Sequence, residues 1–268
     1  MVDVRMEKNL LRPVGYVVCG LTVALVAAGC ARGEGEADAD RSDPENGPLT
    51  VTLVRHGESF GNASGVVTTS VPGTLLTEDG HEEARAVADE LRPEGHDAVY
   101  SSVMTRTEQT AGYLADSLDL TVDVIEGIHE VDLPLVEGRS EESAGEHILE
   151  MATRWAEGDL EAHLADSLDV EADGLATLEG NTGENGEEFL ERFEGALEHV
   201  YEDGGERPVV FSHGFTIMMG ALLVDGSVDT DEVSMAELVP HTTGTVTLEG
   251  SPDEGWTIVD WMGSGRPE

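Results

Sequence analysis

Two His-Gly pairs in this sequence each follow a run of apolar residues. His56-Gly57 follows Arg55 and the strand-like stretch 49–54, and His213-Gly214 follows the stretch 208–212. An imidazole can act as a nucleophile or carry a proton near neutral pH. The guanidinium of Arg55 presents a planar fork of donors that suits phosphate oxygens. This pattern indicates phosphoryl chemistry on a histidine.

Such side chains need to be held where strands of a sheet end. In an open α/β sheet, ligands bind at the carboxyl ends of the strands, and glycines let backbone N–H groups approach an anion closely. Gly57 and Gly61 lie in the loop after the first strand-like stretch, and Arg106 follows another stretch at 97–100. The sequence thus places two histidines and two arginines after three expected strands.

Strand-like and helix-like segments alternate between residues 49 and 261. Thr77 is a candidate N-cap for a helix that continues until Pro93, and apolar residues repeat at helical spacing in it. Further helices are expected up to Leu118, at 189–200 and at 217–224. Further strands are expected at 121–125, 244–248 and 256–261, of which the last two could form a hairpin. Between about 132 and 186 the pattern loosens into acidic helical pieces, which we interpret as a cap over the sheet.

The net charge of the chain is strongly negative. Its 268 residues include 56 Asp and Glu but only 14 Lys and Arg, which gives a formal net charge of -42. Such a field repels nucleic acid and anionic membrane surfaces, so neither is an expected binding partner. Any positive side chain inside a pocket is therefore conspicuous.

Cysteine and histidine usage does not indicate a bound metal. The two cysteines are Cys19 and Cys30, and the nine histidines show no HExxH or similar pairing. Cys19 lies in an apolar N-terminal segment that would be removed with a signal peptide, so the mature chain would form no disulfide. We expect no metal and no cofactor.

The N-terminal segment 1–30 has the features of an export signal. A basic region with Arg5, Lys8 and Arg12 precedes an apolar stretch that ends in Ala27-Ala28-Gly29-Cys30. This ending resembles a bacterial lipobox, although leucine is commoner at the position of Ala27. We expect lipid attachment at Cys30 and a flexible acidic tether at 31–48, which would hold the protein outside the cytoplasmic membrane. Simple secretion and an uncleaved anchor are the alternatives.

The two His-Gly pairs and Arg106 occur together with further motifs, and in this order the set resembles the histidine phosphatase superfamily, whose fold is phosphoglycerate-mutase-like. The further motifs are Leu76-Thr77-Glu78-Asp79-Gly80, Val99-Tyr100-Ser101-Ser102 with Arg106-Thr107-Glu108-Gln109-Thr110-Ala111, and Gly186-Glu187-Glu188-Phe189. The resemblance covers residues 49–261. It implies a domain at 49–268 with a three-layer α/β/α sandwich, a mostly parallel central sheet and a helical cap insertion at about 132–186.

The resemblance also implies roles for single residues. His56 would be the phosphorylated nucleophile, Arg55 and Arg106 would bind the phosphoryl oxygens, and His213 would stabilise the transferring group. The anion pocket would be completed by Ser59, Asn62 and the backbone of Gly214. The neighbouring cations would favour the neutral, nucleophilic form of His56, which agrees with elementary electrostatics.

The general acid is expected in the segment 130–138. Family members commonly carry a Glu-x-x-x-Gly-x-Trp-Glu-Gly pattern, and this segment matches it at Glu130, Glu137 and Gly138 but has Pro134 and Val136 at the glycine and tryptophan positions. We expect Glu130 to protonate the leaving oxygen, with Glu137 as the alternative. The expected activity is hydrolysis of small phosphomonoesters through a phosphohistidine. A phosphoglycerate mutase-type phosphotransferase and a non-catalytic binding protein for a phosphorylated ligand are the alternatives.

The remaining polar and aromatic candidates are interpreted as structural. We expect solvated side chains at Glu58, His81, His96, His147, His163 and His199, and buried core positions for Trp155, Trp256 and Trp261. His129 and His241 are secondary candidates for lining the pocket.

Overall fold

A six-stranded sheet organises the computed structural model, which describes residues 47–168, 182–203, 205–228 and 234–267. Its strand order is β3-β2-β4-β1-β5-β6. The parallel strands are β1 (Leu49–Arg55), β2 (Ala98–Ser102), β3 (Val122–Ile125) and β4 (Pro208–Ser212). β5 (Thr245–Ser251) and β6 (Gly255–Trp261) form an antiparallel hairpin that is added beside β1. The predicted α/β fold with a mostly parallel sheet is therefore confirmed.

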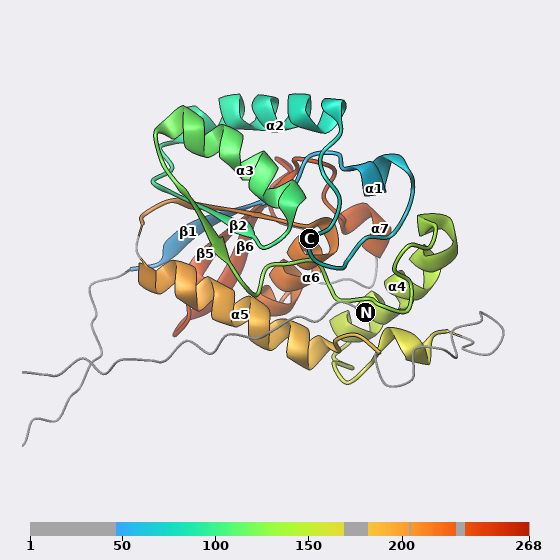
Figure 1. The fold of residues 1–268 in the computed structure, drawn as a ribbon. Helices are drawn as coiled ribbons and strands as arrows, with labels where there is room; N and C mark the ends of the chain where they lie inside the picture. The colour runs from blue at the N-terminus through green and yellow to red at the C-terminus, as the bar shows by residue number, and fades with distance from the viewer. Residues whose placement is uncertain (1–46, 169–181, 204, 229–233, 268) are drawn as a thin grey trace, which may run out of the picture. The chain divides into compact units, whose positions relative to one another are not determined.

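Helices cover both faces of this sheet (Figure 1). α2 (Glu78–Leu91) and α3 (Thr105–Leu118) lie on one face, and α5 (Gly186–Asp203) and α6 (Gly214–Asp225) lie on the other. The strands can support both layers because successive side chains point to opposite faces. In β1 and β4, for example, Val54 and Phe211 pack with the α2 and α3 side, whereas Leu53 and Val210 pack with the α5 and α6 side.

Local signals in the sequence explain where α2 begins and ends. The hydroxyl of its N-cap Thr77 accepts a hydrogen bond from the backbone N–H of Gly80 at 3.0 Å. Glu78 and Asp79 occupy the first turn, where acidic side chains complement the helix dipole. The helix ends at Leu91, just before the short 3-10 helix η1 (Arg92–Glu94) that contains Pro93.

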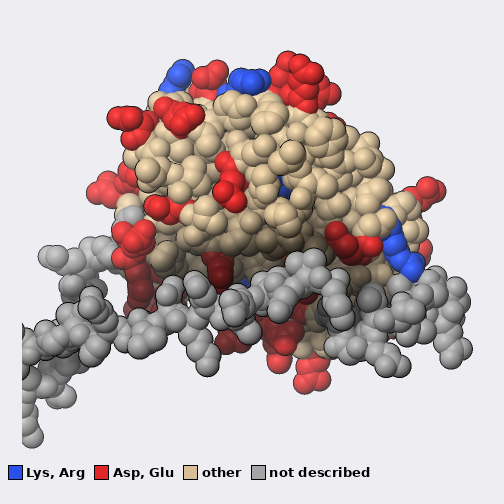
Figure 2. Space-filling model, in the orientation of Figure 1, with Lys and Arg blue, Asp and Glu red and all other residues tan. Residues whose placement is uncertain are grey.

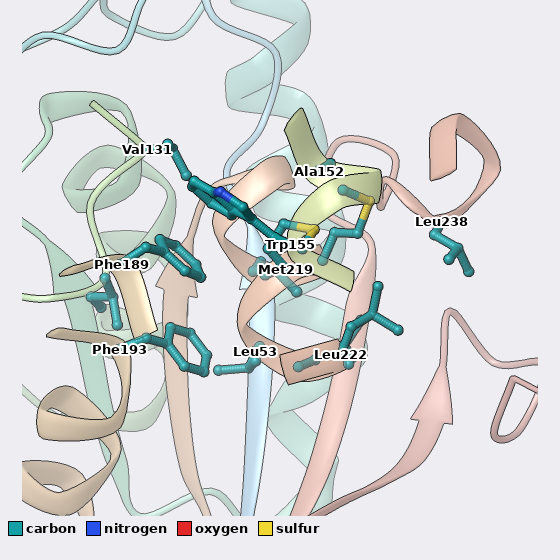
Figure 3. Close-up of a cluster of buried hydrophobic side chains, with 14 of the residues drawn as sticks. Leu53, Val131, Ala152, Trp155, Phe189, Phe193, Met219, Leu222 and Leu238 are labelled. Carbon is teal, nitrogen blue, oxygen red and sulfur yellow. The ribbon is translucent and has the colours of Figure 1, made fainter. Parts of the chain in front are cut away.

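The described part of the predicted cap, 132–168 and 182–186, contains α4 (Glu141–Ala156) and the short 3-10 helix η2 (Leu164–Asp166). Trp155 of α4 joins the cap to the core, since it stacks on Phe189 of α5 with ring centroids 5.5 Å apart (Figure 3). Its indole N–H donates to the carbonyl of Ala162 at 2.9 Å. α4 also packs against α6 and the short helix α7 (Met235–Leu238). All three tryptophans are buried, as predicted.

The structure corrects one surface expectation. His96 is only 6% exposed instead of solvated, and its Nδ1 lies 3.0 Å from the carbonyl oxygen of Arg207. A carbonyl can only accept, so Nδ1 carries the proton there and holds the segment before β2 against the segment before β4.

The expectations for the N-terminus fall outside the described residues. These are the signal peptide at 1–30, lipid attachment at Cys30 and nearly all of the tether at 31–48. In the part of the chain that the structure does describe, no helix is both long and apolar enough to cross a membrane.

Candidate active site

The two predicted histidines and two predicted arginines meet at one edge of the sheet. Arg55 ends β1 and His56 follows it, and His213 follows β4, which pairs with β1 so that Arg55 lies opposite Ser212. Arg106 lies in the first turn of α3, directly after β2. The rings of His56 and His213 are 5.2 Å apart between centroids. We call Arg55, His56, Arg106 and His213 together the phosphoryl cage.

Hydrogen bonds fix the protonation of His56. Its Nδ1 lies 2.7 Å from the carbonyl oxygen of Gly57, and its Nε2 accepts from Nε of Arg106 at 2.9 Å. A carbonyl only accepts and a guanidinium only donates, so the proton is on Nδ1 and the lone pair is on Nε2. Burial, followed by the charges of Arg106 and Arg55, lowers the pKa of His56 well below its usual value. The imidazole is therefore neutral and nucleophilic at Nε2 near neutral pH.

The two arginines present donors that no described residue uses. Arg55 donates from Nη1 to the carbonyl of Pro240 at 2.6 Å, and Arg106 donates from Nη2 to that of Thr68 at 3.1 Å. Nε of Arg55 and Nη1 of Arg106 are buried without a hydrogen-bond partner in the described structure. Unpaired buried donors are costly, so the pair favours an anion with several acceptor oxygens.

A short chain of hydroxyl groups holds His213. Thr107 donates its only hydroxyl proton to the carbonyl of Met104 at 2.6 Å, so it accepts from Oγ of Ser102 at 2.7 Å. Ser102 has then used its own proton and accepts from Nε2 of His213 at 2.8 Å. Nδ1 of His213 is buried and has no hydrogen-bond partner among the described residues. The sequence motifs contained Ser102 and Thr107, but nothing in the sequence revealed this role.

Glu130 enters the same cavity with one oxygen anchored. Its Oε1 accepts from the backbone N–H of Val131 at 3.0 Å and from the backbone N–H of Thr216 at 3.2 Å. It also lies 3.0 Å from the hydroxyl of Thr216, whose single proton it shares with the carbonyl of His129 at 2.9 Å. None of these bonds involves Oε2. Its charge also acts on Arg55 and Arg106, since it partly offsets the lowering of their pKa by burial. The carboxyl group is held in place and keeps an oxygen for proton transfer.

The alternative acid, Glu137, lies elsewhere. Its Oε2 accepts from the backbone N–H and hydroxyl of Thr69 at 2.7 and 3.0 Å and from the backbone N–H of Ser70 at 3.1 Å. Glu137 does not line the cavity that Arg55, His56, Arg106 and Glu130 share. The geometry therefore favours Glu130 as the acid, whereas Glu137 holds the loop at Thr69 and Ser70 in place.

Of the three expected pocket residues, two line the cavity. Gly214 begins α6, whose first N–H groups have no partner within the helix, and a Cβ there would lie 3.1 Å from Cζ of Arg55. Asn62 also lines the cavity, with its Oδ1 accepting from the N–H and hydroxyl of Ser59. Ser59 itself does not line it; Ser59 is the N-cap of the short helix α1 (Phe60–Ala63). Ser59 therefore supports Asn62 instead of contacting an anion directly.

The cavity lined by Arg55, His56 and Arg106 of the phosphoryl cage has a volume of about 340 Å³. A larger groove of about 750 Å³ contains His129 and Arg192, but no member of the phosphoryl cage lines it. His241 is exposed and lines neither space. Neither secondary histidine candidate thus reaches the site.

Comparisons with known proteins agree with this geometry. The family described as the histidine phosphatase superfamily, branch 1, matches residues 51–262. The chain is 31% identical over 230 residues to the PE-PGRS family protein PE_PGRS11 of Mycobacterium tuberculosis, covering 80% of this chain but only 36% of that protein. It is 29% identical over 176 residues to the Yersinia pestis protein described as "Probable phosphoglycerate mutase GpmB", covering 65% of this chain and 73% of that protein.

The fold is also similar to that of solved structures. One is a mycobacterial glucosyl-3-phosphoglycerate phosphatase in complex with VO3, with a TM-score of 0.59 and 20% sequence identity. The match covers 81% of this chain and 100% of that one. At this identity the likeness concerns the fold alone.

Proposed function

The chain belongs to the histidine phosphatase superfamily, branch 1, and we propose that within it the chain hydrolyses small phosphomonoesters through a phosphohistidine at His56. One observation carries the proposal. The lone pair on Nε2 of His56, two guanidiniums with unused donors and the anchored carboxyl group of Glu130 all belong to one cavity. A nucleophile, charge stabilisation and a proton donor are what phosphoryl transfer from an ester requires.

In the first step, Nε2 of His56 attacks phosphorus and the bond from phosphorus to the ester oxygen breaks. Glu130, in its protonated form, gives its proton to the departing alkoxide, which leaves as the alcohol. For this to happen, Nε of Arg106 has to leave the His56 lone pair, because it occupies that position at 2.9 Å. A phosphoryl group offers Arg106 oxygens that accept in place of Nε2.

In the second step, water attacks phosphorus and the bond between Nε2 and phosphorus breaks. Glu130, now a carboxylate, takes a proton from that water, so it returns to its starting form and inorganic phosphate is released. Arg55 and Arg106 bear the charge on the equatorial oxygens in both steps, because they are fixed in a buried site where such interactions are strong.

A phosphoglycerate mutase-type activity is the alternative, and the 29% identity to the Yersinia protein is the observation that favours it. Such a substrate carries a carboxylate besides its phosphate. Arg55 and Arg106 are the only Lys or Arg residues among the described residues that line the cavity, and both belong to the phosphoryl cage. This scarcity of cations supports the hydrolase over the mutase.

We further propose that the enzyme acts outside the cytoplasmic membrane of a bacterium, held there by a lipid on Cys30. The proposal rests on the export signal and lipobox-like ending at 1–30. Small organic phosphates arriving from outside would then be its substrates. Secretion without an anchor is the alternative.

The test is to trap the phosphoenzyme. Rapid quench of the wild-type domain with a phosphomonoester should give acid-labile phosphate on the chain, and His56→Ala should lose both this phosphate and turnover. The exposed His199 on α5 provides a matched control, since His199→Ala should keep both. Absence of trapped phosphate together with an active His56→Ala enzyme would refute the proposal. Faster transfer to a phosphoglycerate than to water would establish the mutase.

A further inference from the structure

One face of α4 forms the wall of the cavity outside the phosphoryl cage. Glu141, Gly145, Ile148 and Leu149 line the cavity, and their spacing of four, three and one residues places them on the same side of the helix. The face is acidic at the first turn of α4, open at Gly145 and apolar further along. An ester bound by the phosphoryl cage would direct its alcohol part into this region.

Most of the rest of this region is apolar, apart from Thr68 and Thr69. The side chains that complete it include Val66, Val67, Leu133, Phe215, Ala236 and Val239. Apolar walls favour carbon chains because burial removes their surface from water. The alcohol part of the substrate therefore fits best if it is largely hydrocarbon.

Charge in this region has one sign. Glu141 is exposed at the rim, and its charge acts on Arg55, where it opposes the lowering of the pKa by burial. Acidic side chains also spread over much of the surface visible in Figure 2. A second anion on the substrate would be repelled here, whereas a cation would be attracted.

Gly145 leaves room for such a group. It lies within α4, where glycine is the least favourable residue apart from proline, yet a Cβ at this position would meet no atom within 4 Å. Packing therefore does not require glycine. Its absent side chain widens the cavity between Glu141 and the apolar end of the helix face.

We propose that this face of α4 selects the substrate, and that the preferred substrates are phosphorylated amino alcohols. The carbon chain would lie along Ile148 and Leu149, and the ammonium group would lie near the carboxylate of Glu141. The inference rests on the proposed function, because it concerns the leaving group of the same reaction. An acidic residue in a first turn also stabilises a helix, and Glu142 shares that role without lining the cavity. Glu142 is therefore the matched control.

The experiment compares esters with the same two-carbon spacer and end groups of different charge. Phosphocholine carries a cation, 3,3-dimethylbutyl phosphate is its neutral isostere, and 3-phosphooxypropanoate carries a second anion. We expect kcat/KM for phosphocholine to exceed that of the isostere about fivefold, the upper end for a solvent-exposed ion pair, and the anionic ester to be the poorest. Glu141→Gln should remove the difference between phosphocholine and its isostere, and Glu142→Gln should keep it.

A second set of variants tests the space at Gly145. Gly145→Leu should lower kcat/KM for phosphocholine and its isostere alike and leave methyl phosphate unchanged. Gly195 in α5 is a matched control, since a Cβ there also meets nothing within 4 Å and the residue does not line the catalytic cavity. Gly195→Leu should therefore change none of the three.

The outcomes separate this inference from the proposed function. If 4-nitrophenyl phosphate is hydrolysed through a phosphoenzyme but charge has no effect, or Glu141→Gln and Glu142→Gln behave alike, the inference is wrong and the phosphatase stands. If the anionic ester is the best substrate, the inference is likewise wrong. If no ester is hydrolysed and no phosphoenzyme forms, the proposed function fails and the inference fails with it.

Discussion

Replacing Glu130 by Gln should remove its proton without disturbing its surroundings. Oε1 accepts from the backbone N–H groups of Val131 and Thr216, and it shares the Thr216 hydroxyl with the carbonyl of His129. A glutamine carbonyl accepts from the same donors, so no buried donor loses its partner. What Glu130→Gln removes is the acid at the other oxygen.

The expected magnitudes follow from this geometry. Hydrogen bonds to a charged acceptor are stronger than those to a neutral one, so Glu130→Gln should lower the free energy of unfolding by about 1 kcal/mol. For a domain of this size that corresponds to a fall in Tm of about 2–4 °C. General acid catalysis contributes about 10²–10⁴-fold, so a thousandfold loss, equal to about 4 kcal/mol, is expected where the leaving alkoxide needs a proton.

The assay compares an alkyl phosphate with 4-nitrophenyl phosphate. The alkyl ester should lose about a thousandfold in kcat/KM, whereas the aryl ester should lose far less, about tenfold or under, because its leaving group needs little protonation. The comparison uses kcat/KM because it covers the steps through release of the alcohol, whereas kcat also contains the attack of water, in which Glu130 acts as base for both esters alike. Glu137→Gln makes the same chemical change on a carboxylate that accepts three bonds, from Thr69 and Ser70. It should leave the ratio between the two esters unchanged.

Two results would refute this reasoning. Equal losses on both esters in Glu130→Gln would mean that the residue does not protonate the leaving group. A selective loss on the alkyl ester in Glu137→Gln instead would assign the acid to the loop residue. Circular dichroism and Tm measured on both variants exclude unfolding as the cause.

Three further predictions concern pH, location and salt. Burial lowers the pKa of both His56 and His213 below the value in the unfolded chain, so the unfolded chain binds more protons. The free energy of unfolding should therefore be highest above about pH 6.5. Below that pH it should fall by up to about 1.4 kcal/mol per pH unit for each histidine. The free energy of unfolding, measured by urea titration at several pH values below about 6.5, should depend less steeply on pH in His56→Gln than in the wild type, by about one proton. The same dependence in both proteins would contradict the assigned pKa shift. Cys30→Ala should release the protein from membranes or block its processing, and a failure to label Cys30 with a fatty acid in a bacterial host would count against the anchor. Singly phosphorylated esters should be better substrates than highly phosphorylated ones, by a margin that narrows as salt rises, and a preference for inositol hexakisphosphate at low ionic strength would contradict this.

The sequence predicted the parts of the site that local signals determine. An apolar stretch followed by His-Gly marks the end of a buried strand, and the ends of parallel strands share one edge of a sheet. His56 and His213 therefore could be placed together before the structure was known. The same holds for Arg106, which directly follows a strand, and for the N-cap Thr77.

Contacts between distant segments could not be predicted in this way. The hydrogen bonds of Glu130 to Thr216 join residues 86 positions apart, and that of Ser102 to His213 joins residues 111 positions apart. The spacing of residues in the sequence indicates helices and strands but not which distant residues contact each other. Ser59 was expected at the anion from the family resemblance, but as the N-cap of the four-residue helix α1 it bonds to Asn62 instead. The burial of His96 likewise depends on a carbonyl 111 residues away.

The phosphoryl cage is assembled from the ends of β1, β2 and β4, so it does not exist in the unfolded chain. Until these strands pair, His56 is a solvated imidazole of ordinary basicity, and Arg106 and His213 lie far from it along the chain. The site therefore forms only when strands that are distant in the sequence pair, and this pairing is the slow part of folding for such topologies. An unfolded chain therefore lacks the arrangement of side chains that the proposed hydrolysis requires. Recovery of turnover after dilution from denaturant would therefore time the completion of the sheet.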